Sequence, residues 1–165
     1  MMENLDETDI RILRELQQNA RLTVKELATK VHLSPTPVFE RQKRLEREGY
    51  IKRYVAQLDS RRLGTGIIVL CNIRLKQHSQ HYIQEFMDAV QNIEQITECY
   101  NISGDFDFII KVHARDMRDY QAFMLNTLGT IDCIGSLNSV FVIGEIKGSQ
   151  GIPLPRINSQ NKHNV

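Results

Sequence analysis

The sequence predicts an α+β protein with two domains, because the spacing of its apolar residues changes once along the 165 residues. Up to about residue 50, apolar residues recur every three or four positions, which is typical of amphipathic helices. From Ile67 onward, short runs rich in Ile and Val alternate with helical patterns. Between these regions, residues 59–66 have the Gly, Ser and charged composition of a linker. We therefore expect a helical domain over 1–58, a strand-and-helix domain over 67–147 and a mobile C-terminal tail over 148–165.

The first domain is expected to hold three helices, and the first two have recognisable starts. Asp6 can cap the first helix, because a carboxylate accepts hydrogen bonds from the free N–H groups of a first turn. Thr23 and Glu26 have the spacing of a capping box, which predicts the start of the second helix. The apolar face of the first helix is expected to consist of Ile10, Leu13 and Leu16, which recur every three residues. Ile12 is expected at the flank of this face.

The third helix is expected to follow a short turn at His32. Ser34 can cap this helix, and Pro35 suits its first position, where a missing N–H costs nothing. An extended run over 50–58 predicts a wing strand. Two helices joined by a short turn, after a supporting helix, match the helix-turn-helix plan, so we expect a winged helix-turn-helix domain. Three apolar residues of the third helix are expected to face the core: Val38, Phe39 and Leu45.

The charge of the chain is unevenly distributed. A net charge of +1 argues against a nucleic-acid partner, because such domains usually carry a basic surplus. However, residues 41–53 hold six basic and two acidic side chains, whereas residues 1–20 hold two basic and five acidic ones. The basic segment overlaps the third helix, which in helix-turn-helix proteins enters the major groove of DNA. The residues expected to be exposed on this helix are Thr36, Glu40, Arg41, Lys43, Arg44 and Arg47.

The second domain has the element order β-α-β-β-α-β. Strands are expected over 67–76, 96–102, 106–112 and 137–146, and helices after Ser79 and Asp116. This order predicts the ferredoxin-like fold, in which one antiparallel sheet carries both helices on one face. The other face of the sheet would be uncovered in a monomer, so we expect it to pair with a second subunit.

Three segments resemble the Lrp/AsnC, or feast/famine, family of transcription regulators. LDETDIRILRELQQNAR is similar to the first helix of the family, LSPTPVFERQKRLEREGYI to its turn and recognition helix, and SGDFDFIIKV to a hairpin of its effector domain. The resemblance extends over about residues 5–147. It implies a sequence-specific DNA-binding transcription regulator, a homodimer that assembles further into octamers or discs, and a non-covalent amino-acid effector bound between effector domains.

The resemblance also implies roles for individual residues. DNA contact falls to Ser34, Thr36, Pro37, Arg41, Arg44 and Arg47, to which the charge pattern adds Lys43. Effector binding falls to Gly104, Asp105 and Asp107. A glycine lets the backbone approach a ligand, and a carboxylate can accept hydrogen bonds from an α-ammonium group. The alternative is that Gly104 and Asp105 only form a good hairpin turn. One departure from the family is Asp132-Cys133-Ile134, where Pro-Gly-Val is usual, and it leaves the identity of the effector open.

Other chemistry finds little support in the sequence. His78 and His81 could share one helix face, but no further residue completes a zinc spacing, so we expect no metal or other cofactor. No catalytic motif is present, and we do not expect an enzyme. The odd number of cysteines predicts a cytoplasmic protein, and the lack of a long apolar run predicts no membrane partner. The resemblance to DNA-binding regulators implies that the protein is nucleoid-associated. The alternative function is an oligomeric metabolite-sensing module whose N-terminal domain recruits protein or RNA.

Overall fold

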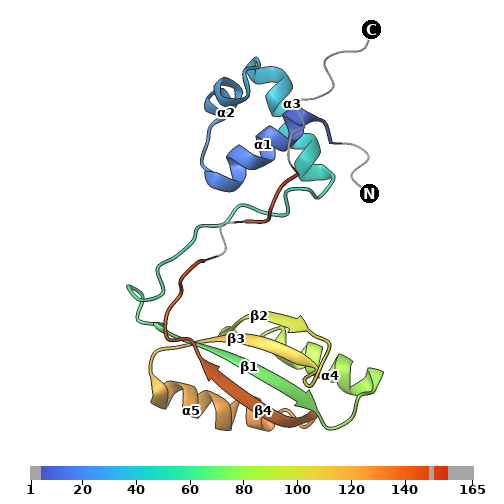
Figure 1. Cartoon of the computed structure of the whole chain (residues 1–165), viewed down its shortest axis with the longest axis vertical. Coiled ribbons are helices and arrows are strands. Elements are labelled where there is room, and N and C mark those ends of the chain that lie inside the picture. Colours follow the sequence, from blue (N-terminus) through green and yellow to red (C-terminus); the bar gives the residue numbers. More distant parts are fainter. Residues whose placement is uncertain (1–4, 149–150, 156–165) are drawn as a thin grey trace. The chain divides into compact units, whose positions relative to one another are not determined.

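The computed structural model describes residues 5–148 and 151–155, which divide into two compact units. The first unit comprises the described residues up to Gln57 together with those from Lys147 onward. The second unit is Leu58–Ile146. Figure 1 shows that the first unit is helical and that the second is built on a sheet.

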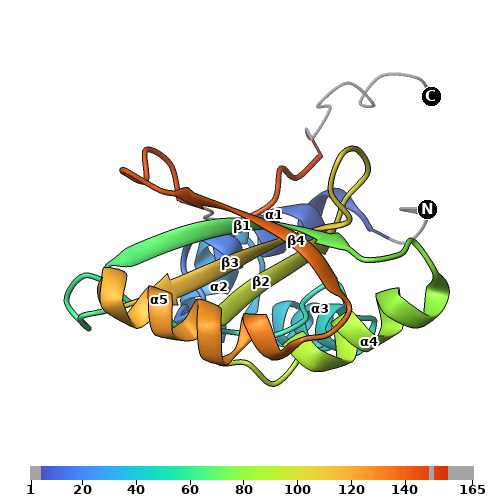
Figure 2. The ribbon, with the colours of Figure 1, turned by 90° about the horizontal axis from the view of Figure 1, so that it is seen from below.

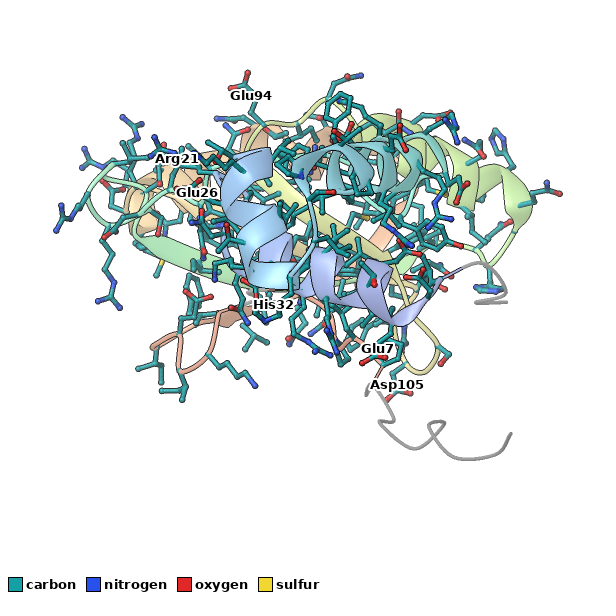
Figure 3. All side chains as sticks on the ribbon, turned by 90° about the horizontal axis from the view of Figure 1, so that it is seen from above. Glu7, Arg21, Glu26, His32, Glu94 and Asp105 are labelled. Carbon is teal, nitrogen blue, oxygen red and sulfur yellow. The ribbon has the colours of Figure 1, made fainter. Side chains whose placement is uncertain are left out.

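The first unit is a three-helix domain with one apolar core. Its helices are α1 (Glu7–Gln18), α2 (Val24–Val31) and α3 (Pro35–Arg47). His32, labelled in Figure 3, ends α2 in the left-handed conformation with φ 57°, so the chain turns sharply into α3. This is the predicted helix-turn-helix. The buried core residues are contributed by all three helices: Ile12, Leu16, Leu27, Ala28, Val31, Val38 and Leu45.

The helix starts confirm the predicted caps, with one difference. Asp6 and Thr23 each form a complete capping box. Ser34 occupies the cap position of α3, but its side chain makes no capping hydrogen bond. A cap residue bonds to the second or third N–H of its helix, and the third residue of α3 is Pro37, which has none. The Ser34 hydroxyl is therefore not used by the helix.

Other expectations for this unit are wrong. Phe39, expected to face the core, is 48% exposed, because Val38 and Leu45 occupy the core-facing side of α3. Ile12, expected at the flank of α1, is fully buried, because the core face of this helix runs through Ile12 and Leu16. The wing strand expected over 50–58 does not form, since no strand within the described residues pairs with this segment. The segment instead contacts the end of α3: the Ile51 N–H donates to the Leu45 carbonyl, and the Tyr54 hydroxyl donates to the Glu46 carboxylate.

The second unit has the predicted βαββαβ order. Its elements are β1 (Ile67–Leu75), α4 (Gln80–Val90), β2 (Ile96–Asn101), β3 (Phe108–Ala114), α5 (Met117–Asn126), a 3-10 turn η1 (Leu128–Thr130) and β4 (Ile134–Phe141). The sheet order is β2-β3-β1-β4 and every pairing is antiparallel. Figure 2 shows α4 and α5 along the same side of the sheet, which confirms the ferredoxin-like arrangement.

One face of the sheet forms the core of the second unit. Alternate residues of β1 and β3 are buried against Phe86 of α4 and Phe123 of α5: Val69, Cys71 and Ile73, and Phe108, Ile110 and Val112. No helix of the unit packs on the opposite face. There Ile68, Leu70 and Ile109 are half-buried, and their strand neighbours Val140 and Tyr100 are 47% and 54% exposed.

All four strands differ from the expected ranges: β1 and β2 each end one residue earlier, β3 ends at Ala114 rather than Val112, and β4 begins at Ile134 rather than Leu137. β3 begins at Phe108 rather than Phe106, because the Phe106 ring lies beside the Arg74 guanidinium, outside the ladder. β4 ends at Phe141 rather than Ile146: Phe141 is its last residue paired with β1, opposite Val69, and beyond it the Val142 N–H donates to the Ile68 carbonyl. Apolar residues beyond this end, such as Ile143, are therefore exposed.

Part of the expected C-terminal tail contacts α1. Gln17 donates from its Nε2 to the Ile152 carbonyl at 2.8 Å and accepts from the Ile152 N–H at 3.2 Å. Arg14 donates to the Pro155 carbonyl. Gly151 has φ 129°, and a Cβ there would collide with the Gln17 side chain. Residues 149–150 and 156–165 of the expected tail lie outside the described residues. Among the described helices, none is long and apolar enough to cross a membrane.

Candidate functional site

The outer side of α3 carries one continuous exposed stripe. Thr36, Lys43 and Arg47 are spaced seven and four residues apart, which places them on one face of a helix, and all three are exposed. Ser34 is exposed at the start of the helix, and Pro37 is partly buried beside it. The Lys43 ammonium lies 2.8 Å from Glu46, which raises the pKa of this lysine and keeps it charged.

The inner side of α3 carries two arginines that bind α1 instead of facing solvent. Arg41 lies 2.6 Å from Asp6 and 2.8 Å from Asp9, and Arg44 lies 2.5 Å from Asp9. The Asp9 side chain is 1% exposed, and among the described residues Asp9 is the only charged residue that is buried. Arg44 Nε is buried without a hydrogen-bond partner in this part of the chain. We call these four residues, Asp6, Asp9, Arg41 and Arg44, the α1–α3 ion cluster.

The α1–α3 ion cluster stabilises the charged forms of its members. Partial burial would raise the pKa of Asp6, but the Asp9 N–H and the Arg41 guanidinium together lower it below the ordinary value. Hydrogen bonds to Asp9 and Asp6 raise the pKa of Arg41. Much of the acidic surplus of the first twenty residues and of the basic surplus of α3 is thus paired inside the unit.

The predicted effector residues lie at the β2–β3 hairpin but do not converge. Gly104 has φ 126°, a conformation that favours glycine, and a Cβ at this position would have no other atom within 4 Å. Asp105, labelled in Figure 3, has an exposed side chain, and its carbonyl accepts hydrogen bonds from the Arg74 guanidinium. Asp107 is different, because its side chain points to the end of β1.

Asp107 joins the hairpin to the segment after β1. Its Oδ2 accepts the Leu75 N–H at 2.8 Å, and its Oδ1 lies 2.8 Å from His78 Nδ1. Its side chain is 13% exposed, whereas that of His78 is 78% exposed. Burial would raise the pKa of Asp107, but the Leu75 N–H and His78 lower it below the ordinary value. A ligand ammonium at Asp107 would therefore compete with His78.

The segment that departs from the family pattern reaches the same strand end. The Cys133 carbonyl accepts the Lys76 N–H at 2.9 Å. A Cβ on Gly135 would lie 3.0 Å from the Leu75 carbonyl group, so glycine allows this close approach. The end of β1 is therefore the point where the hairpin, His78 and residues 132–135 come together.

The two histidines weighed as metal ligands face different partners. His78 contacts Asp107, whereas His81 lies 3.8 Å from Glu85, one turn further along α4. Within the described ranges, no group of three His, Cys, Asp or Glu side chains could hold a metal ion.

Comparison with known proteins agrees with this architecture. The family model of the Lrp/AsnC ligand binding domain matches residues 68–152, and a winged helix-turn-helix DNA-binding model matches residues 5–52. The chain belongs to the Lrp/AsnC family. Members of this family are transcription regulators rather than enzymes, so the predicted family, fold class and function are confirmed.

Lrp/AsnC regulators of several bacteria are similar to this chain over most of its length. The leucine-responsive regulatory protein of Escherichia coli is 38% identical over 146 residues, which cover 88% of this chain and 89% of that protein. The Bkd operon transcriptional regulator of Pseudomonas aeruginosa is 35% identical over 93% of this chain and its own full length. A transcriptional regulator of Neisseria meningitidis, crystallised with L-methionine, has a TM-score of 0.87 and 31% identity over 91% of this chain and 97% of its own.

Sequence reasoning missed three residues that organise these Lrp/AsnC sites: Asp9, Arg74 and His78. The inward position of Arg41 could have been predicted from the sequence. This residue lies three residues after Val38 and four before Leu45, on the core-facing side of α3. The antiparallel pairing of β1 with β3, opposing Ile73 to Phe108, brings Arg74 and His78 to the hairpin. That pairing follows from the βαββαβ order, so their neighbourhood could have been expected from the topology.

Proposed function

We propose that this Lrp/AsnC regulator reads operator DNA with the exposed stripe of α3, and that Arg41 and Arg44 hold α3 on α1. The observation that carries the proposal is the separation of the two faces of one helix. Thr36, Lys43 and Arg47 are exposed together, and the Ser34 hydroxyl is unused by the helix. In helix-turn-helix domains the start of the second helix meets base edges, while basic side chains and free hydroxyls contact phosphates.

The DNA-bound form is proposed to be a homodimer, with assembly to octamers as the family resemblance implies. The face of the sheet opposite α4 and α5 supports this, since half-buried Ile68, Leu70 and Ile109 adjoin exposed Tyr100 and Val140. Such an apolar face is stabilised by burial against a second copy. Two recognition helices about 34 Å apart would then meet successive major grooves of a near-palindromic site.

The effector is proposed to be an amino acid that binds near the end of β1. Asp105 is exposed and could hold an α-ammonium group directly, whereas Asp107 can do so only by releasing His78. The Neisseria meningitidis regulator crystallised with L-methionine supports an amino acid as the ligand class. A ligand that binds one assembly state better than another would shift the assembly and thereby the DNA binding. A regulator of this kind would act on the nucleoid in the cytoplasm.

Binding measurements with the full chain test this proposal. A duplex selected from a random library should bind at least about a hundredfold more tightly than random duplex, and affinity should fall steeply with added salt. In a thermal-shift series with the twenty amino acids, the effector should raise the melting temperature, because it binds only the native state. Equal affinity for selected and random duplex would refute sequence-specific regulation. A series without any shift would refute an amino-acid effector.

A further inference from the structure

The exposed stripe of α3 contains an aromatic residue that the sequence pattern assigned to the core. Phe39 is 48% exposed, whereas its neighbour Val38 and the next core residue, Leu45, are fully buried. The core of the unit is therefore complete without the Phe39 ring. The Lys43 ammonium lies 5.8 Å from the centre of this ring, so a cation–π contact holds the ring on the outer side of the helix.

The position of Phe39 in the helix decides which part of DNA it would meet. Phe39 is the fifth residue of α3, three residues after Thr36 and four before Lys43, so it belongs to the stripe proposed to face DNA. A single exposed apolar side chain is ordinary on a protein surface. On the helix proposed to enter the major groove, however, it would lie between the start of the helix, which meets base edges, and the basic residues that meet phosphates.

The chemistry around Phe39 limits what this part of the helix can read. Arginine recognises guanine through paired hydrogen bonds, but Arg41 and Arg44 are engaged by Asp9. Arg47 is exposed, but it lies in the last turn of α3, away from the start of the helix that meets base edges. Phenylalanine offers no hydrogen bond, and its partner in the major groove is the C5-methyl group of thymine.

We propose that Phe39 is a specificity-determining residue that contacts the C5-methyl group of one thymine in each operator half-site. The inference rests on the proposed function and deepens it, since it states a base that the operator must contain. It also assigns a role to an exposed phenyl ring that contributes nothing to the core of its own domain.

Replacement of thymine by deoxyuridine tests the proposal, because it removes the methyl group and leaves the hydrogen-bonding edges unchanged. Each thymine of a duplex selected by the full chain is replaced in turn, and affinity is measured by fluorescence anisotropy. At one thymine per half-site we expect the native protein to lose about fourfold in affinity, the value that corresponds to about 0.8 kcal/mol for one buried methylene-sized group. Replacement at both half-sites should cost about fifteenfold.

Protein variants then assign the effect to the side chain. Phe39→Ala should bind the thymine and deoxyuridine duplexes equally, and Phe39→Leu should retain part of the difference. Arg47→Ala is the matched control on the same stripe, since it should weaken both duplexes and keep their ratio. The melting temperature should not fall in Phe39→Ala, because the core does not contain this ring.

The outcomes separate this proposal from the proposed function. If the selected duplex binds tightly but tolerates deoxyuridine at every thymine, the Phe39 contact is refuted and sequence-specific binding stands. The same conclusion follows if Phe39→Ala keeps the full difference, or if it changes the mass of the assembly instead, which would make Phe39 a contact between copies. If no duplex is selected over random DNA, both proposals fail.

Discussion

Two partly or fully buried aspartates, one in each unit, show how the same residue type serves stability in one place and adaptability in another. Asp9 is buried between α1 and α3 and binds two guanidinium groups. Asp107 lies at the end of β1 and binds one backbone N–H and the imidazole of His78, which is 78% exposed. Both carboxylates accept charge-assisted hydrogen bonds, but their partners differ in charge and in exposure.

This difference indicates which contact can open during function. Arginine keeps its charge at every pH at which proteins fold, and a buried carboxylate that loses its partners is left at a high cost in free energy. Histidine is charged only when protonated, and an exposed side chain returns to water at little cost. We therefore expect the α1–α3 ion cluster to remain closed during DNA binding, and the Asp107–His78 contact to be the one that a ligand displaces.

The largest effect is expected from Asp9→Ala. This change leaves Arg41 and Arg44 without their buried partner and also removes one half of the α1 capping box. Loss of one side of a buried ion pair costs about 3–5 kcal/mol. Chemical denaturation followed by circular dichroism should show this loss in the helical unit. Glu7→Ala, in the same helical turn but exposed, is the control and should change stability by less than about 1 kcal/mol.

A smaller effect should distinguish the two faces of α3. Arg44→Ala should lower the free energy of unfolding by about 2 kcal/mol, because Asp9 keeps Arg41 as a partner. Lys43→Ala should leave stability unchanged, because this side chain is exposed, and should reduce the salt dependence of DNA binding by about one unit of slope. Thermal unfolding and salt titrations of DNA affinity measure the two quantities. An Arg44→Ala protein that keeps its stability but loses DNA affinity would contradict the assigned faces.

The smallest effect is expected at Asp107. Asp107→Ala removes the acceptor for the Leu75 N–H and should cost about 1 kcal/mol at neutral pH. Since the native pKa of Asp107 is lowered, its stabilising contribution is present above the unfolded-state pKa near 4 and is lost as the pH falls through the native pKa. The stability difference between the native protein and Asp107→Ala should therefore shrink below about pH 4. A difference that persists unchanged in acid would show that the contact does not depend on the charge.

Much of the fold could be predicted because its signals are local. The capping boxes at Asp6 and Thr23 need residues only three positions apart, and the sequence shows both members of each box. The βαββαβ order follows from apolar periodicity within short segments. Strand ends were less predictable: apolar Ile143 suggested a longer β4, but the pairing with β1 ends at Phe141, although β1 itself begins two residues earlier, at Ile67. Where two strands part depends on tertiary packing and not on local composition.

The candidate sites were predictable as regions but not as contacts. The basic segment and the hairpin signature identified α3 and the loop after β2. The sequence could not show that Arg44 meets Asp9, because the two residues are 35 positions apart and either could be solvated on its own helix. Likewise, Asp107 and His78 are 29 positions apart and meet only through the pairing of β1 with β3.

The amino-acid sequence alone was sufficient to establish the order of the elements, the helix-turn-helix, the family and the helix that carries the basic charge. Tertiary packing decided how that charge is used. It turned Arg41 and Arg44 toward a buried carboxylate and left Phe39 on the outer face with Lys43. The physical reason is that periodicity and capping depend on neighbours within a turn, whereas the partner of a charge or of an aromatic ring depends on which distant surfaces the core brings together.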